Sequence, residues 1–217
     1  MADLLGAGLV VGVRQAKARQ GEEARPAVHD DLCAMVDKHG ATRHVFTADA
    51  PNELWLSDIT EHRTSEGKLY VCAIKHAYSN RIVGYSIDSR MKSRLAVAAL
   101  NNAVARRGNV AGCVVHTDRG SHFRSRNFAA ALKPPRHGRI HDRVGAAGDN
   151  AAMESFFSLL QKNVLDRHAW ATREELRIEI VRWIERTYHR RRRQTAPGRL
   201  TPIEFETIMT APATKAA

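Results

Sequence analysis

Three acidic residues stand where the local sequence does not require an acid. Asp58 interrupts an apolar run, Asp118 ends a second apolar run, and Glu154 is flanked by alanine, methionine and phenylalanine residues. Burying an unpaired carboxylate costs several kcal/mol or forces its protonation, so a partner should offset that cost. Carboxylate oxygens are hard ligands, and three of them in one cleft predict a site for Mg²⁺ or Mn²⁺.

Such a cluster can hold two metal ions about 3.5 to 4 Å apart, which act on the attacking and leaving oxygens of a phosphodiester displacement. Each acid alone also has an ordinary explanation. Glu154 fits the solvated side of a helix, Asp118 fits turn chemistry before a glycine, and Asp58 fits an edge strand that faces water. The elements that position the acids decide between these interpretations.

Four short β-rich runs are expected, at residues 53–60, 68–78, 81–89 and 112–118. The first three are joined by tight connections and predict an antiparallel meander. The fourth is apolar throughout, which is typical of a parallel strand covered on both faces. If the first and fourth strands are neighbours, the two aspartates can meet, and a helix across the sheet end can bring the glutamate beside them.

Helical spacing marks the segment 93–108, with Ser93 available to cap its start and Gly108 to end it. A capping box, Thr172 with Glu175, begins another helix. The further helices are expected at residues 124–132, 149–166 and 172–190. The order βββαβ followed by helices predicts an α/β fold, a mixed sheet flanked by helices.

Residues 1–45 are expected to form an irregular arm with no core of its own, with at most one short helix at 32–44. The apolar start followed directly by charged residues resembles the tail of a longer domain. A core at 46–208 and a tail at 209–217 complete the expected organisation.

The composition favours a nucleic-acid partner. The 217 residues include 34 Lys and Arg against 23 Asp and Glu, which give a formal net charge of +11 and a pI near 10.1. Such a surface attracts polyanions. No apolar run approaches the roughly 20 residues that span a bilayer, no signal peptide is recognisable, and the three cysteines form no C-x-x-C pair. A cytoplasmic protein without a membrane partner is expected.

Basic residues gather near the end of the helix expected at 172–190. The run "HRRRRQ", residues 189–194, exceeds what is needed to complement a helix dipole, and phosphate contact by Arg190, Arg191, Arg192 and Arg193 is expected.

Thirty-five residues, 119 to 153, separate Asp118 from Glu154. This spacing, with an upstream strand aspartate, resembles the D,D-35-E catalytic core of retroviral integrases and many insertion-sequence transposases. The surroundings "WLSDIT", "HTDRGS", "GDNAAMESFF" and "RRRRQTAPGRLTPIEF" are similar to transposases whose second reading frame carries an integrase-type core. The similarity extends from about Phe46 to Ile208, and four motifs in the same order are specific.

The resemblance implies an RNase H-like fold with a five-stranded sheet, in which Asp58, Asp118 and Glu154 are the catalytic acids and bind Mg²⁺ or Mn²⁺, as two ions. Residues 145–150 would be a mobile glycine loop before the glutamate helix. Further site residues implied by their positions are Arg119 and Lys162 as DNA contacts, with Asn150 and His122 in supporting roles. Gln161 holds the place where related cores carry a lysine, and Lys162 lies about 80° further around an ideal helix.

Two kinds of departure from the family pattern stand out. His76 and His122 replace an aspartate and a glutamine that relatives usually carry, and neither is one of the three acids. Pro134 and Pro135 fall where the family has a short strand before the glycine loop, and prolines are expected to break a strand there.

The predicted function is that of a transposase that cleaves DNA and joins the freed 3′ hydroxyl to a target strand. The expected partners are transposon-end and target DNA, further copies of this chain on DNA, and an upstream-frame helix-turn-helix protein that recognises the ends. Two alternatives stay open at this point. One is an RNase H-like nuclease that cuts without joining, and the other is an inactive DNA-binding remnant.

Overall fold

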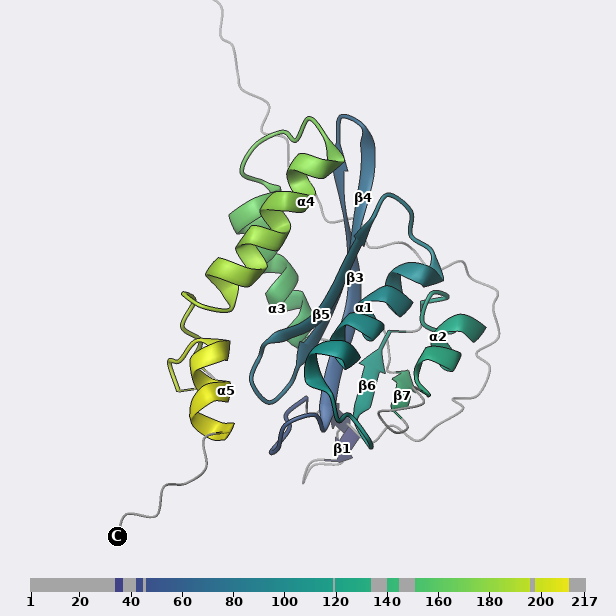
Figure 1. Ribbon diagram of the computed structural model, residues 1–217, viewed down its shortest axis with the longest axis vertical. Helices are drawn as coiled ribbons and strands as arrows, with labels where there is room; N and C mark the ends of the chain where they lie inside the picture. The colour runs from purple at the N-terminus through teal and green to yellow at the C-terminus, as the bar shows by residue number, and fades with distance from the viewer. Residues whose placement is uncertain are drawn as a thin grey trace, which may run out of the picture.

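The computed structural model describes residues 34–36, 42–44, 46–118, 120–133, 140–144, 151–195 and 198–210. Its elements, shown in Figure 1, are β1 (Ala34–Val36), β2 (Thr42–His44), β3 (Leu54–Thr64), β4 (Gly67–His76), β5 (Ile82–Asp88), α1 (Ser93–Arg107), β6 (Val114–Thr117), α2 (Arg126–Ala131), β7 (His141–Val144), α3 (Ala151–Leu160), the π-helix η1 (Gln161–Leu165), α4 (Arg173–Arg182), the π-helix η2 (Trp183–Tyr188) and α5 (Pro202–Thr210).

The main sheet has the strand order β5-β4-β3-β6-β7. The antiparallel meander expected from the sequence is confirmed, because β3 pairs with β4 and β4 with β5 in antiparallel register. The apolar fourth run is also confirmed as a parallel strand, since β6 pairs in parallel with β3 on one side and β7 on the other. The first and fourth strands of this sheet are therefore neighbours.

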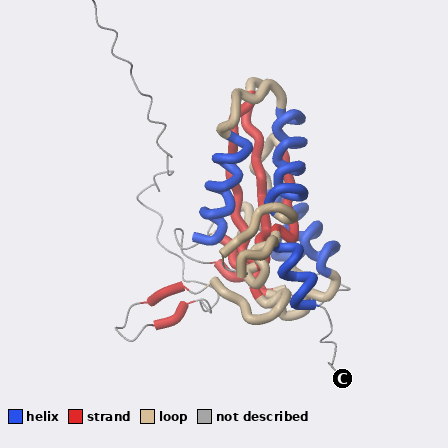
Figure 2. The backbone as a smooth tube through the Cα atoms, turned by 90° about the vertical axis from the view of Figure 1, so that its left-hand side faces the viewer, coloured by secondary structure: helices blue, strands red, loops and turns tan. Residues whose placement is uncertain are grey.

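Helices cover both faces of the sheet (Figure 2). On one face α1 and α2 pack against residues such as Trp55, Ile74 and Val115. Gly84 of β5 allows α1 to approach closely, since a Cβ there would lie 2.7 Å from the Ala103 Cβ. The cluster on the other face is formed with α3, η1, α4 and η2.

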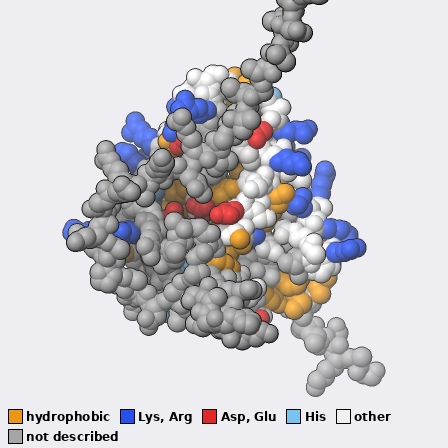
Figure 3. Space-filling model, turned by 180° about the vertical axis from the view of Figure 1, so that it is seen from behind, with side chains coloured by type: hydrophobic (Ala, Val, Ile, Leu, Met, Phe, Trp, Pro, Cys, Tyr) orange, Lys and Arg blue, Asp and Glu red, His pale blue; other side chains and the backbone are white. Residues whose placement is uncertain are grey.

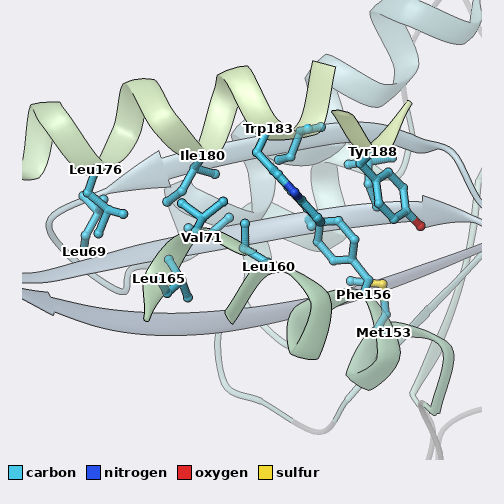
Figure 4. Close-up of a cluster of buried hydrophobic side chains, with 14 of the residues drawn as sticks. Leu69, Val71, Met153, Phe156, Leu160, Leu165, Leu176, Ile180, Trp183 and Tyr188 are labelled. Carbon is cyan, nitrogen blue, oxygen red and sulfur yellow. The ribbon is translucent and has the colours of Figure 1, made fainter. Parts of the chain in front are cut away.

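That second cluster is rich in aromatic side chains. Phe156 of α3 packs against both Trp183 and Tyr188 of η2, with ring centroids 6.0 and 5.0 Å away. Figure 4 shows these rings at one end of the cluster, with Val71 of β4 near its middle and Leu69 of β4 beside Leu176 at the other end. Burying such large apolar side chains is the main favourable term that holds α3 against the sheet.

The helix boundaries mostly follow the sequence signals. Thr172 caps α4 by accepting a hydrogen bond from Glu175 N–H at 3.1 Å, and Gly108 ends α1 with φ of 70°. Ser93 does not cap α1 as expected; it is the first helical residue, and the N-cap Lys92 makes no side-chain capping bond. The two long helices continue as π-helices, η1 and η2, which the 3.6-residue pattern did not distinguish.

Two local expectations were wrong. Residues 34–36 and 42–44 form an antiparallel two-stranded sheet where one short helix was expected, with Met35 opposite Arg43. The short strand that Pro134 and Pro135 were expected to break is also present. It is β7, which begins at His141, downstream of both prolines. Residues 134–139 lie outside the described part of the chain.

None of the helices in the described ranges is both long and apolar enough to cross a bilayer.

The helix α5 was not expected from the sequence, although a signal was present. Thr201 and Glu204 form a reciprocal capping box around Pro202: the Glu204 N–H donates to Thr201 Oγ1 at 3.2 Å, and the Thr201 N–H donates to Glu204 Oε2 at 2.9 Å.

Glu206 ties α5 to the core. Its carboxylate accepts hydrogen bonds from Ser79 Oγ at 2.7 Å, Arg81 Nη1 at 2.7 Å and Arg107 Nη1 at 2.8 Å. His76 Nδ1 lies 3.1 Å from the same carboxylate. Burial alone would raise the pKa of Glu206, but the His76 and Arg81 hydrogen bonds and the Arg107 charge hold it below its ordinary range.

We predict that Glu206→Gln lowers the free energy of unfolding by about 3 kcal/mol, because removing one partner leaves the two guanidinium groups poorly paired in a buried site. Urea denaturation at neutral pH measures this change. The control is Glu61→Gln, whose carboxylate is 47% exposed and paired with Lys68 at the surface; its loss should cost less than about 1 kcal/mol. Equal effects of the two substitutions would contradict this account of α5.

Candidate active site where β6 ends beside β3

The site begins where the parallel pairing of β3 and β6 stops. The paired positions are Leu54 with Val114, Trp55 with Val115 and Leu56 with His116. Two residues further along each strand direction come Asp58 and Asp118. Because parallel strands in register bring equivalent positions side by side, the two aspartates lie together at this end of β6.

The turn after β6 holds the Asp118 carboxylate. The Gly120 N–H donates a hydrogen bond to Asp118 Oδ1 at 2.9 Å, which is the turn chemistry expected of a strand-ending aspartate. Glycine is needed for this approach, since a Cβ at residue 120 would come 2.8 Å from the same oxygen. The turn therefore orients the side chain, and the ordinary and the catalytic interpretations of Asp118 are compatible.

Glu154 lies in the first turn of α3. Its neighbours Met153, Phe156 and Leu160 are fully buried and fix the helix against the sheet, while Glu154 itself is exposed. The helix therefore presents Glu154 at the surface, close to the sheet end that carries the two aspartates.

Electrostatic interactions connect Asp58 with Asp118 and Glu154. Burial, with smaller contributions from the charges of Asp118 and Glu154, raises the pKa of Asp58 to about 6, although a hydrogen bond from the Ile59 N–H acts in the opposite direction. The nearby Cys72 thiol is buried, and burial raises its pKa to about 12, with smaller contributions from the Asp58 and Asp118 charges. Three carboxylates thus share one local field, in which a cation is favoured.

The donor chemistry fits a divalent cation, because all three groups offer hard oxygen ligands. The three side chains do not form a closed ligand set, however: within the described ranges no group of three or more His, Cys, Asp and Glu residues is arranged to hold a metal ion. On the face seen in Figure 3, acidic side chains gather near the centre, with Lys and Arg side chains towards the edge. A negative centre with positive surroundings suits both a cation and a polyanion.

The basic residues lie beyond the acids. Lys162 is exposed on η1. Because η1 is a π-helix, the position of Lys162 expected from the geometry of an ideal α-helix does not apply. Gln161 forms a hydrogen bond with Asp166. The residues Arg190, Arg191, Arg192 and Arg193 are exposed and follow η2.

His189 does not belong to this exposed run. It is fully buried; its Nε2 accepts from the Ile82 N–H at 3.2 Å and its Nδ1 faces Glu185 at 3.2 Å. Burial lowers the pKa of His189, which favours the neutral ring. Arg193 is partly engaged as well, since its Nη2 lies 3.8 Å from Glu204 Oε1.

The remaining predicted site residues divide into two groups. His122 is half-buried in the turn that follows Asp118, and its carbonyl accepts from Ser125 Oγ at 2.9 Å. Arg119, Asn150 and the whole loop 145–150 lie outside the described residues. His76, which departs from the family pattern, is a buried structural residue that accepts from the Asn52 N–H at 2.8 Å.

Sequence reasoning missed Lys75, a buried lysine that follows Ile74 in β4 and reaches α3. Burial lowers its pKa to about 8. The signal was available, because a lysine interrupts the apolar run "VCAIKHA", but a lysine in such a run can also extend its side chain to water.

Comparisons with known proteins concern the family and the fold of the chain. Two family models, both described as an integrase core domain, match residues 48–136 and 139–202. Transposase InsF for insertion sequence IS3A, from Escherichia coli (strain K12), is 38% identical over 164 residues, which cover 74% of this chain and 56% of that protein. The transposase for insertion sequence element IS904, from Lactococcus lactis subsp. lactis (strain IL1403), is 32% identical over 80% of this chain and 68% of that protein. The chain thus spans little more than half the length of the InsF transposases.

Solved structures share the fold at low sequence identity. The HTLV-2 integrase catalytic core domain in complex with magnesium, in its trimeric form, aligns with a TM-score of 0.53 and 18% identity over 73% of this chain and 98% of that one. A chain of the simian T-cell lymphotropic virus intasome in complex with PP2A regulatory subunit B56 gamma aligns with a TM-score of 0.60 and 18% identity, over 79% of this chain and 59% of that one.

We predict that Asp58→Asn stabilises the metal-free protein at pH 8 and leaves its stability nearly unchanged at pH 4. The raised pKa means that the folded chain holds a proton that the unfolded chain releases, so stability falls as pH rises from about 4 to about 6. An asparagine removes that loss, which for a pKa raised from 3.8 to about 6 is worth roughly 3 kcal/mol at pH 8. Urea denaturation in the presence of a chelator measures it, with the exposed Asp49→Asn as control. A destabilised Asp58→Asn protein at pH 8 would show that the carboxylate is structural.

Proposed function

The chain belongs to the IS3-family insertion-sequence transposases with an integrase core domain, and on that premise we propose that Asp58, Asp118 and Glu154 carry its catalysis. They would hold Mg²⁺, or Mn²⁺, as a pair of ions where β6 ends beside the middle of β3. The observation that supports this most directly is the parallel register of β3 and β6, which brings Asp58 and Asp118 side by side, with the charges of Asp118 and Glu154 both acting on Asp58. The magnesium complex of the HTLV-2 integrase core is consistent with the choice of ion.

Each acid has its own role in the proposed site. Asp58 is fixed by the long β3 strand, Asp118 is oriented by the Gly120 N–H, and Glu154 approaches from α3. When bound, the metal would make the attacking hydroxyl or water more nucleophilic and stabilise the leaving oxygen. The protein itself keeps the three carboxylates close together and would place the scissile phosphate between them and the basic residues.

The DNA would lie across this face. Lys162 is proposed to contact a phosphate near the active site, and the exposed arginines 190 to 193 to contact phosphates further away. Arg119, His122 and Asn150 are proposed to contact DNA or support the acids. Transposon ends and target DNA are the proposed substrates, and the reaction is cleavage followed by joining of the 3′ hydroxyl to a target strand.

The wider organisation is also proposed from the family. Residues 46–208 would act as an RNase H-like catalytic core preceded by an arm and followed by a short tail. The relative in the viral intasome supports the proposal that copies of this chain assemble on DNA. An upstream-frame helix-turn-helix protein is the proposed source of end recognition, and a DNA-associated place in the cytoplasm is the proposed location.

We predict that Asp58→Asn, Asp118→Asn and Glu154→Gln each reduce metal-dependent cleavage and strand transfer by at least about 10³-fold, a loss of about 4 kcal/mol in transition-state stabilisation. DNA affinity should change little, because each substitution removes a metal ligand and no phosphate contact. Strand transfer with labelled end-sequence DNA in Mg²⁺ and in Mn²⁺ measures this, and a joined product separates a transposase from a nuclease that only cuts. A variant with near-normal turnover would remove that residue from the site.

We predict that the triple substitution Arg190→Gln, Arg191→Gln and Arg192→Gln makes DNA binding less dependent on salt. If each arginine contacts one phosphate, the slope of log K against log salt should become less steep by roughly 2 to 3. Fluorescence anisotropy with random duplex DNA over a salt series measures the slope. Lys68→Gln, at a surface pair with Glu61, is the control and should leave it unchanged. An unaltered slope in the triple variant would place the DNA elsewhere.

A further inference from the structure

A buried lysine lies between the sheet and the helix that carries Glu154. Lys75 is only 5% exposed and occupies the end of β4, opposite Leu56 of β3. Its Nζ donates a hydrogen bond of 3.0 Å to the carbonyl oxygen of Ala152, in the first turn of α3. This contact connects the central strands directly to the turn that presents Glu154.

The stability of the fold does not explain Lys75. Its ammonium has three donors, and the described residues supply one hydrogen-bond acceptor for them. It also lies at the N-terminal end of α3, where the helix dipole disfavours a cation. The preceding positions on the same strand face, Leu69, Val71 and Ala73, are apolar and pack in the cluster that contains α3. An apolar side chain at residue 75 would continue that face without burying a charge.

The geometry gives Lys75 a different role. Ala152 precedes Glu154 by two residues in the same helical turn, so a bond that fixes one fixes the other. Strand β4 is paired with β3 along ten residue pairs, one of which is Asp58 with Ala73. A hydrogen bond from β4 to α3 therefore sets the position of Glu154 relative to Asp58. The apolar contacts of Met153 and Phe156 are not directional, whereas a hydrogen bond defines both distance and angle.

We propose that Lys75 is a positioning residue that holds the first turn of α3 so that Glu154 can share a divalent cation with Asp58 and Asp118. This inference rests on the proposed function, in which the three acids bind that cation. Groups that orient metal ligands typically contribute 10- to 100-fold to metal affinity. The proposal therefore separates two properties: Lys75 should increase metal affinity while it lowers the stability of the metal-free fold.

The test is Lys75→Met, which keeps an unbranched side chain, one heavy atom shorter, and removes the charge and the donor. In the metal-free protein we expect the Tm to rise by a few degrees or stay constant. Mn²⁺ affinity, measured by calorimetric titration of the full chain, should fall at least about tenfold. Lys75→Arg, which retains donors, should keep more of the affinity than Lys75→Met. Lys68→Met, on the same strand but with an exposed side chain, is the control and should change neither property.

The outcomes separate the two levels of the argument. If Glu154→Gln weakens Mn²⁺ binding and Lys75→Met does not, the positioning role is wrong and the proposed metal site stands. If Lys75→Met lowers Tm and Mn²⁺ affinity together, Lys75 is a structural residue and the inference is overturned. If Glu154→Gln leaves Mn²⁺ binding unchanged, the proposed site is wrong, and the role of Lys75 is overturned with it.

Discussion

The parallel pairing of β3 with β6, and its end after three residue pairs, is the constraint on which the rest of the structure depends. While the strands are paired, their side chains belong to the core, as Trp55 and Val115 show. Where the pairing stops, Asp58 and Asp118 are left side by side at the edge of the core. A longer β6 would bury both carboxylates, and a shifted register would separate them, because a slip of one residue moves a side chain to the opposite face.

The third acid depends on packing on the other face of the sheet. Phe156 is held among Trp183 and Tyr188, and this contact orients α3 so that Glu154 stays at the surface near the aspartates. Large apolar burial allows the fold to tolerate unfavourable electrostatics nearby. The raised pKa of Asp58 and the buried Lys75 are both unfavourable for the fold alone. Local features of this kind concentrate at functional sites, where they are maintained for chemistry and not for stability.

Much of this could be predicted from the sequence, for identifiable reasons. The strand patterns around Asp58 and Asp118 gave the correct neighbours, because alternation and continuous apolar runs report burial directly. The capping signals of Thr172 and Gly108 worked because they act over a few residues. The features that the sequence did not predict are of two kinds: contacts between residues far apart in the chain, and short elements such as β1 and β2. The partner of Lys75 is 77 residues away in the sequence, and Glu206 binds residues about 100 or more positions earlier.

The most direct test of the central claim, that the three acids bind one metal centre, is anomalous diffraction from crystals of this chain grown or soaked in Mn²⁺. The account predicts anomalous density where β6 ends beside the middle of β3, roughly 2 Å from carboxylate oxygens of both Asp58 and Asp118, with the first turn of α3 placed so that Glu154 completes the ligand set. Ordered carboxylates with no anomalous density between them at saturating Mn²⁺, or a Mn²⁺ ion held by other residues, would contradict it.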